Sequence, residues 1–264
     1  MDLNLQGKVA VVTGGSDGIG FAIAAALAAE GAHSIICARD GKHLEEAARA
    51  IERGSKVKCI GVAADLSTAD SVSAIAEAAA RELGGVDFLI NNAGTGTNET
   101  IMDSDDAKWL HFWNLHVMAA VRLARALVPM MRERGGGVIL NNASICATQP
   151  LGYEPIYNVT KAALVMLSKC MANEFIGDNI RVNTVNPGLV KTRDWVKTAT
   201  QLGAKEGITA DEYLERIARE NAPIGRFATP EELAQFFVFL CSPRASYSVG
   251  SSYFVDGGWL KTIT

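Results

Sequence analysis

The sequence predicts an α/β fold, with a parallel β-sheet covered by helices on both faces. Short apolar runs alternate with helical stretches through most of the 264 residues. Runs such as KVAVVTG (8–14) and GVILNNAS (137–144) are nearly continuous and do not alternate with polar residues. Such runs are typical of strands buried on both faces. Seven strand–helix units without a change in composition indicate one doubly wound domain over residues 1–264.

The strand candidates follow one another in order, and most are followed by a helical stretch. A long helical stretch is expected from Ser104 to Arg134, and another follows the fifth strand. The seven candidate strands are 8–14, 33–39, 57–65, 86–94, 137–144, 180–188 and 251–258.

One segment, residues 189–226, departs from this alternation. Its helix-forming stretches DWVKTATQL and TADEYLERIARE are interrupted by glycines and Pro223. Ligands bind beyond the carboxyl ends of the strands in open α/β sheets. A segment after the sixth strand is therefore placed to cover a substrate, although a surface hairpin without a ligand role is the alternative.

Composition excludes several classes of function. The net charge is −4 and the pI is near 5.6, so nothing favours nucleic acid or an anionic membrane as a partner. No signal peptide or membrane span is expected. Five scattered cysteines indicate reduced thiols and a cytoplasmic protein, and the histidines and cysteines lack the spacing of a metal site.

The stretch TGGSDGIG (13–20) lies between the first strand and the first helix. Glycines here allow a tight turn, close approach of a pyrophosphate and packing of the helix on the strand. The following helix N-terminus adds free N–H groups and a positive dipole end. The spacing differs from G-x-G-x-x-G, so a turn without a ligand remains the alternative.

Several motifs together resemble the short-chain dehydrogenase/reductase family, in particular members similar to 3-oxoacyl-carrier-protein reductase and tropinone reductase. They are TGGSDGIG, NNAG (91–94), Ser144 thirteen residues before Y-x-x-x-K (157–161), and PGLVKT (187–192). The ending VDGG (255–258) also fits, so the resemblance covers residues 5–258. It implies a Rossmann domain and a nicotinamide cofactor.

The resemblance also implies which residues bind the cofactor. Asp65 would bond the adenine, the segment 92–94 would pass beside the adenosine ribose, and the segment 187–192 would hold the nicotinamide end. The full set is Gly14, Ser16, Asp17, Gly18, Ile19, Gly20, Arg39, Asp65, Leu66, Asn92, Ala93, Gly94, Tyr157, Lys161, Pro187, Gly188, Val190 and Thr192.

The end of the second strand favours NADP(H), with NAD(H) as the alternative. Family members that use NAD carry an acid where this chain has Ala38, and Arg39 follows. An arginine can stack on adenine and pair with a 2′-phosphate. Asp17 opposes this choice if it faces the phosphate, or if it or Asp40 neutralises Arg39. It could instead interact with the first N–H groups of the helix.

Four residues match the catalytic group of the family. Tyr157 and Lys161 are one helical turn apart, so the ammonium is expected to stabilise the phenolate and make Tyr157 a general acid/base. By resemblance, Ser144 would bond the substrate oxygen, and Asn114 would hold a water beside the lysine on a proton path to solvent. Relatives carry two serines after this strand, and here the first is Ala143.

A mainly apolar pocket is expected for a mid-sized ketone or secondary alcohol. Trp195 could instead only pack the covering helices. In this family the two long helices pair across a two-fold axis, and the resemblance implies a homotetramer. The pocket candidates are Ser144, Ile145, Cys146, Gln149, Tyr153, Leu189 and Trp195.

The sequence thus predicts an oxidoreductase that transfers a hydride between NADP(H) and a carbonyl or secondary alcohol. One alternative is a catalytically silent dinucleotide-binding sensor or scaffold, against which the intact catalytic residues argue. Another is an NAD-dependent alcohol dehydrogenase of the same fold. A third keeps the fold but runs an epimerisation or dehydration through a transient ketone.

Overall fold

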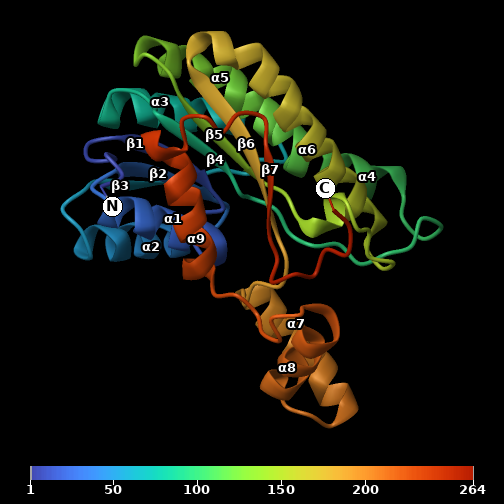
Figure 1. Cartoon of the computed structure of the whole chain (residues 1–264). Helices are drawn as coiled ribbons and strands as arrows, with labels where there is room; N and C mark the ends of the chain where they lie inside the picture. The colour runs from blue at the N-terminus through green and yellow to red at the C-terminus, as the bar shows by residue number, and fades with distance from the viewer. Residues whose placement is uncertain (1, 264) are drawn as a thin grey trace.

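The computed structural model describes residues 2–263 and has the predicted architecture, a single seven-stranded parallel sheet in the order β3-β2-β1-β4-β5-β6-β7 (Figure 1). This is a Rossmann arrangement, in which the strand order reverses between β1 and β4. The strands are β1 (Val9–Thr13), β2 (His33–Ala38), β3 (Cys59–Ala63), β4 (Phe88–Asn91), β5 (Gly137–Asn142), β6 (Ile180–Pro187) and β7 (Ser252–Val255).

Helices cover both faces, as the continuous apolar strands predict. One core lies between the sheet and α1 (Gly18–Ala29), α2 (Gly41–Arg53) and α9 (Pro230–Cys241). The other lies beneath α3 (Ser71–Leu83), α5 (Ala119–Glu133) and α6 (Pro155–Phe175). Alternate residues of β1 serve the two cores, with Val12 in the first and Val11 in the second.

The long helix expected over 104–134 is interrupted. It consists of α4 (Asp106–Trp113), a π-helical turn over Asn114–Met118 and then α5. The Ala119 N–H donates to the Asn114 carbonyl, five residues back. Such a turn holds one residue more than an α-helical turn and changes which side chains face inward.

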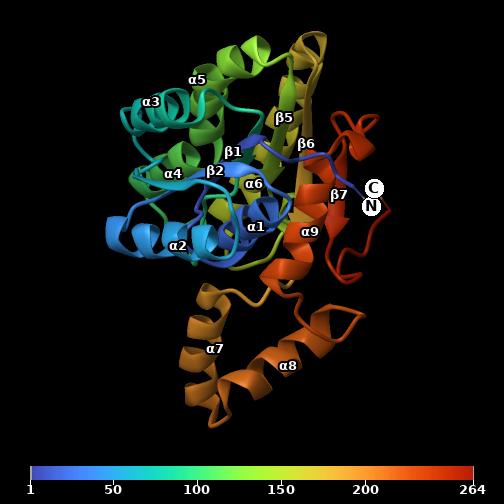
Figure 2. The ribbon, with the colours of Figure 1, turned by 90° about the vertical axis from the view of Figure 1, so that its left-hand side faces the viewer.

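The segment 189–226 forms a helical hairpin of α7 (Arg193–Glu206) and α8 (Ala210–Asn221). It extends away from the body beyond the carboxyl end of β6, as Figures 1 and 2 show. The two helices share a small core of Ala199, Tyr213 and Leu214. No helix among residues 2–263 is long and apolar enough to span a bilayer.

Asp87 ties the start of β4 to two neighbouring elements. Its side chain is 4% exposed, and its oxygens accept from the Val9 N–H at 2.9 Å, Lys8 Nζ at 3.1 Å and Arg134 at 2.7 Å. A buried carboxylate is stable only when it is paired and hydrogen-bonded. Asp87 therefore joins β1 and the end of α5 at the amino edge of the sheet.

We expect Asp87→Ala to lower the free energy of unfolding by about 3 kcal/mol, because it leaves the buried Val9 N–H and two cations without their acceptor. Asp178→Ala is the control, since the Arg132–Asp178 pair is more exposed. It should cost less than about 1 kcal/mol. Urea unfolding followed by circular dichroism measures both, and equal losses would contradict the assignment.

Candidate active site

The glycine-rich turn between β1 and α1 closes tightly on itself. Gly14 has φ 65°, and a Cβ on Gly20 would lie 2.2 Å from the Gly14 carbonyl oxygen. Gly18 has φ 54°, and a Cβ there would enter the gap toward Thr192, whose Cγ2 would be 3.7 Å away. Only glycines suit these positions. The turn and helix N-terminus therefore fit a pyrophosphate next to Thr192.

Asp17 is the N-cap of α1. Its Oδ1 accepts from the Gly18 N–H at 2.7 Å, and its Oδ2 lies 3.6 Å from Arg193. A carboxylate at this position suits the positive end of the helix dipole. Of the orientations that the sequence left open, the structure shows Asp17 turned toward the first N–H of α1 and toward the covering segment.

Arg39 lies exposed at the end of β2. Within residues 2–263 neither neighbouring acid pairs with it, because Asp17 contacts Arg193 and Asp40 caps α2 by accepting from the N–H groups of Lys42 and His43. Asp65 accepts from Ser67, and these hydrogen bonds hold its carboxyl pKa below the usual value. The Arg39 charge also lowers it.

A hydrogen-bonded chain of amides joins the turn to the catalytic lysine. Asn92 donates to the Thr13 carbonyl at 2.9 Å, and Asn142 donates to Asn92 Oδ1 at 2.8 Å. Lys161 Nζ, on a residue 3% exposed, donates to the Asn142 carbonyl at 2.8 Å. The carboxyl ends of β1, β4 and β5 are thereby held in register around the site.

The structure brings Ser144, Tyr157 and Lys161 together. Lys161 Nζ lies 5.3 Å from the centre of the Tyr157 ring. The nearby Ser144 hydroxyl lowers the pKa of the phenol, although burial outweighs it. Burial raises the pKa of the Tyr157 phenol above its usual value and so opposes the expected stabilisation of the phenolate by the ammonium. Burial also lowers the pKa of Lys161 to about 8.

Asn114 does not face this group. It lies in the π-helical turn, where its Nδ2 donates to the Leu110 carbonyl at 2.9 Å and its Oδ1 accepts from Arg122 at 2.5 Å. His116, two residues later, lies against the group instead. Its ring centre is 5.6 Å from that of Tyr157, edge to face.

His116 is a buried, neutral histidine beside Lys161. Its pKa is lowered to about 2, first by burial and then by the Lys161 charge. A Cβ on Gly94 would lie 3.1 Å from His116 Nε2 and 3.6 Å from Lys161 Nζ. Thr160 Oγ1 donates to the Ile156 carbonyl, so it accepts from His116 Nδ1, 2.8 Å away. Nε2 is then the acceptor nitrogen, and it has no hydrogen-bond partner within residues 2–263.

Four of the predicted pocket residues gather in one apolar cluster with the Tyr157 ring. They are Ile145, Cys146, Leu189 and Trp195, and the cluster also contains Trp259 from the chain end. Trp195, in α7, additionally packs against Phe227, which follows the covering hairpin, at 5.2 Å between ring centres.

Two other pocket candidates, Gln149 and Tyr153, are not part of this apolar cluster. Gln149 Oε1 accepts from the Lys261 N–H at 3.1 Å, and Tyr153 is 50% exposed.

A buried acid that the sequence did not reveal, Glu154, lies against this apolar cluster. Glu154 is 7% exposed, and the Cys146 thiol donates to its Oε1 at 3.4 Å. The Cys146 N–H in turn donates to Ser144 Oγ at 3.2 Å. Burial raises the pKa of Glu154 to about 7. In the sequence, Glu154 shows only as an acid directly before Pro155 and three residues before Tyr157.

The remaining predicted cofactor residues lie around the glycine-rich turn and at the carboxyl end of β6. Gly188 packs so closely that a Cβ would lie 2.8 Å from the backbone of Asp256. Thr192 caps α7, and Val190 bridges to Ala228. Leu66 is buried after β3, Ile19 and Gly20 open α1, Ser16 precedes Asp17, Ala93 follows Asn92, and Pro187 ends β6.

Comparisons with known proteins agree with this geometry. The family model described as enoyl-(acyl carrier protein) reductase matches residues 14–260. Human dehydrogenase/reductase SDR family member 4 is 35% identical over 96% of this chain and 88% of that protein. The uncharacterized oxidoreductase YvrD of Bacillus subtilis is 36% identical over the full length of both chains.

Solved structures extend the likeness to three dimensions. L-sorbose reductase from Gluconobacter frateurii, complexed with NADPH and L-sorbose, has a TM-score of 0.98 at 60% identity, with both chains covered completely. A short-chain type dehydrogenase/reductase from Mycobacterium marinum has a TM-score of 0.85 at 29% identity, over 99% of this chain and 98% of that one. The chain belongs to the short-chain dehydrogenase/reductase family of oxidoreductases.

Proposed function

We propose that the chain is an NADPH-dependent reductase of polyhydroxylated ketones, which it converts reversibly to polyols. The observation that carries this proposal is the buried Glu154 carboxyl, which lies against an apolar cluster close to Ser144 and Tyr157. A buried carboxyl binds hydroxyl groups well and has no use in a pocket for a plain ketone. The 60% identity to an L-sorbose reductase supports the same substrate class.

NADPH, when bound, supplies the hydride, and the protein supplies orientation and the proton. Tyr157 retains its proton at neutral pH because burial raises its pKa, so it donates that proton to the ketone oxygen. The Ser144 hydroxyl donates a hydrogen bond to the same oxygen. Lys161, whose pKa is lowered to about 8, is then able to pass on a proton near neutral pH.

His116 takes the position that the family gives to its asparagine. Its neutral ring lies beside Tyr157, and its Nε2 and the Lys161 ammonium both lie next to Gly94. Nε2 would accept a hydrogen bond from Lys161 or from a water beside it and so connect the lysine to solvent. Asn114 would act only on the shape of the π-helical turn.

Arg39 would select NADPH over NADH. It is exposed at the end of β2 and free of ion pairs within residues 2–263, whereas Asp17 is engaged by Gly18 and Arg193. A guanidinium at this point suits a 2′-phosphate. The NADPH bound to the sorbose reductase supports the choice.

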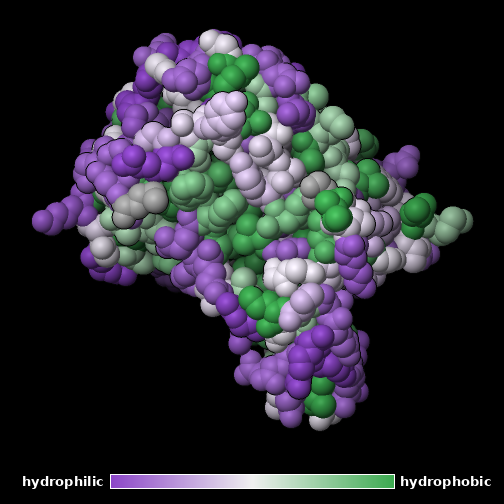
Figure 3. Space-filling model, in the orientation of Figure 1, coloured by the Kyte–Doolittle hydropathy of each residue, from purple (hydrophilic) through white to green (hydrophobic). Residues whose placement is uncertain are grey.

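A homotetramer and a cytoplasmic location complete the proposal. Hydrophobic side chains gather over α9 and β7, across the middle of the face in Figure 3, and Phe236, Phe239 and Tyr253 line a shallow groove there. A second groove runs between α5 and α6. Both grooves offer apolar surface for contacts between subunits. The buried thiols suit the reducing cytoplasm.

Cofactor preference is tested by titrating the protein with NADPH and NADH. NADPH is expected to bind more tightly than NADH. Arg39→Ala should raise the dissociation constant of NADPH by about tenfold or more, because a charge-assisted bond to the 2′-phosphate is lost. The dissociation constant of NADH should not change. Protein fluorescence measures both dissociation constants. Tighter binding of NADH by the unaltered protein would overturn the cofactor proposal.

The reaction is tested with L-sorbose and NADPH. One NADPH should be consumed for each ketone reduced, a stoichiometry that separates reduction from epimerisation or dehydration through a transient ketone. Tyr157→Phe should lower kcat by about 10³-fold, because the proton donor is lost. A Tyr157→Phe variant with full turnover, which a silent binder with a contaminating activity would give, refutes the assignment.

His116 and Asn114 are separated by substituting each in turn. His116→Ala should lower kcat by about 10²-fold through loss of the proton path, and His116→Asn should recover part of this loss. Asn114→Ala should leave kcat near that of the unaltered protein. Steady-state kinetics at saturating NADPH measures kcat for each variant. A larger loss of kcat in Asn114→Ala than in His116→Ala would assign the proton path to Asn114 instead.

A further inference from the structure

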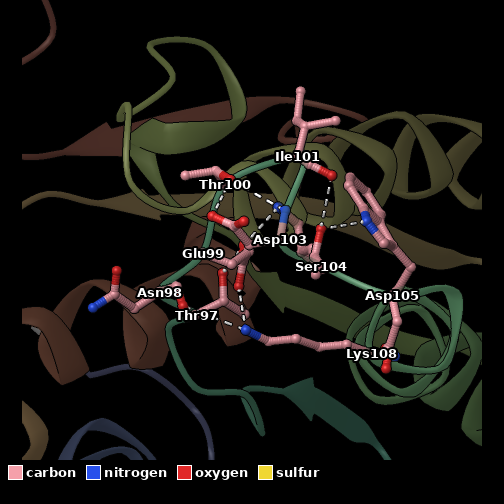
Figure 4. Close-up of polar contacts among 11 residues, drawn as sticks. Thr97, Asn98, Glu99, Thr100, Ile101, Asp103, Ser104, Asp105 and Lys108 are labelled. Carbon is pink, nitrogen blue, oxygen red and sulfur yellow. Dashed lines mark hydrogen bonds and ion pairs between the residues drawn. The ribbon is translucent and has the colours of Figure 1, made fainter.

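A second buried acid, Glu99, lies outside the catalytic group on the loop between β4 and α4. Its side chain is 3% exposed and forms an ion pair with Lys108 Nζ at 2.7 Å. The Thr97 hydroxyl donates to its Oε1 at 2.9 Å. Figure 4 shows Lys108 reaching from α4 back to Glu99 across this loop. These hydrogen bonds outweigh burial and hold the pKa of Glu99 below its usual value.

Glu99 also caps the catalytic helix. Glu154 is the N-cap of α6 but makes no side-chain cap hydrogen bond, and Pro155 follows it. The first free N–H of the helix, that of Ile156, instead donates to Glu99 Oε1 at 3.2 Å. The Glu99 carboxylate, from another part of the chain, thus accepts the hydrogen bond that an N-cap side chain normally accepts. Tyr157 is the next residue along.

The same contact leaves the Glu154 side chain free to enter the pocket. The Glu99 N–H donates to the Tyr153 carbonyl at 3.1 Å, so the loop is bonded on both sides of Glu154. A Cβ on Gly96 would lie 3.5 Å from Glu154 Oε2, which shows that the loop passes directly over this carboxyl.

We propose that Glu99 is a positioning residue, which caps α6 from outside, turns Glu154 into the substrate pocket and sets, through Glu154, the pH range in which hydroxyl-bearing ketones bind. This role rests on the proposed polyhydroxylated substrate. Burial is the main cause that raises the pKa of Glu154 to about 7. The ionised Glu99 beside it adds to this, because two charged carboxyls repel one another.

The groups that face Glu154 come from three elements. The Cys146 thiol approaches from the short helix Ile145–Ala147, Lys161 and Tyr157 from α6, and Glu99 from the β4–α4 loop. Tyr153 is adjacent in the chain. Burial and the Glu99 charge raise the pKa of Glu154, whereas the Cys146 and Thr97 hydrogen bonds and the Lys161 charge lower it.

The ionised carboxylate accepts hydrogen bonds from substrate hydroxyls more strongly than the neutral acid does. The KM for L-sorbose is therefore expected to fall as the pH rises through about 7, where Glu154 loses its proton. Glu99→Gln keeps an oxygen that can accept from the Ile156 N–H but removes the negative charge. Glu154 then ionises more easily, and the midpoint of the KM profile moves to lower pH.

Asp103→Asn is the matched control. Asp103 lies on the same loop and accepts from Thr100 at 2.6 Å, but it does not contact α6 among the described residues. KM is measured against pH, with saturating NADPH, for the unaltered protein and both variants. A lower midpoint in Glu99→Gln alone is expected. A midpoint equal to that of the unaltered protein overturns the proposal, even if kcat falls.

A second readout does not require turnover. The infrared band of the protonated Glu154 carboxyl, assigned by its loss in Glu154→Gln, is followed against pH in the same variants. Its midpoint should also move down in Glu99→Gln and stay in place in Asp103→Asn. If the unaltered protein does not reduce L-sorbose, the proposed function fails, and an unmoved infrared midpoint then separately decides against Glu99.

Discussion

The hydrogen bond from Lys161 Nζ to the Asn142 carbonyl is the interaction on which the rest of the site depends. A buried ammonium is costly unless it is paired, and its partner here is a neutral oxygen at the end of β5. Lys161 forms no ion pair at this point among residues 2–263, so its charge faces Tyr157 at 5.3 Å from the ring centre. Asn142 is itself held by Asn92, which bonds the turn after β1. The lysine is thus placed by the sheet edge that also shapes the cofactor site.

Burial determines the protonation states around this lysine. It raises the pKa of the Tyr157 phenol and of the Glu154 carboxyl, and it lowers those of Lys161 and His116. Each change favours the neutral form, as expected where water is excluded. The site therefore holds a protonated acid for the ketone oxygen and a lysine that loses its proton readily. This state suits reduction.

The sheet, its strand order and much of the site could be predicted because they depend on local patterns. Continuous apolar runs define the buried strands. The spacing of Ser144, Tyr157 and Lys161 in the sequence was enough to predict that the three residues lie together. Asn114 could not be separated from His116, since the π-helical turn changes which side chain faces the lysine. The role of Glu99 depends on a contact with Ile156, 57 residues away, and no local pattern shows it.

Asp17 illustrates how an apparently unsuitable residue fits once its partners are known. As the N-cap of α1 it directs one oxygen to the Gly18 N–H, and Arg193 approaches the other at 3.6 Å. Both partners are positive, so little net charge remains to repel a 2′-phosphate. The pair is exposed and contributes little to stability. It connects the glycine-rich turn to the start of α7, however, so the cofactor site and the covering hairpin meet at this acid.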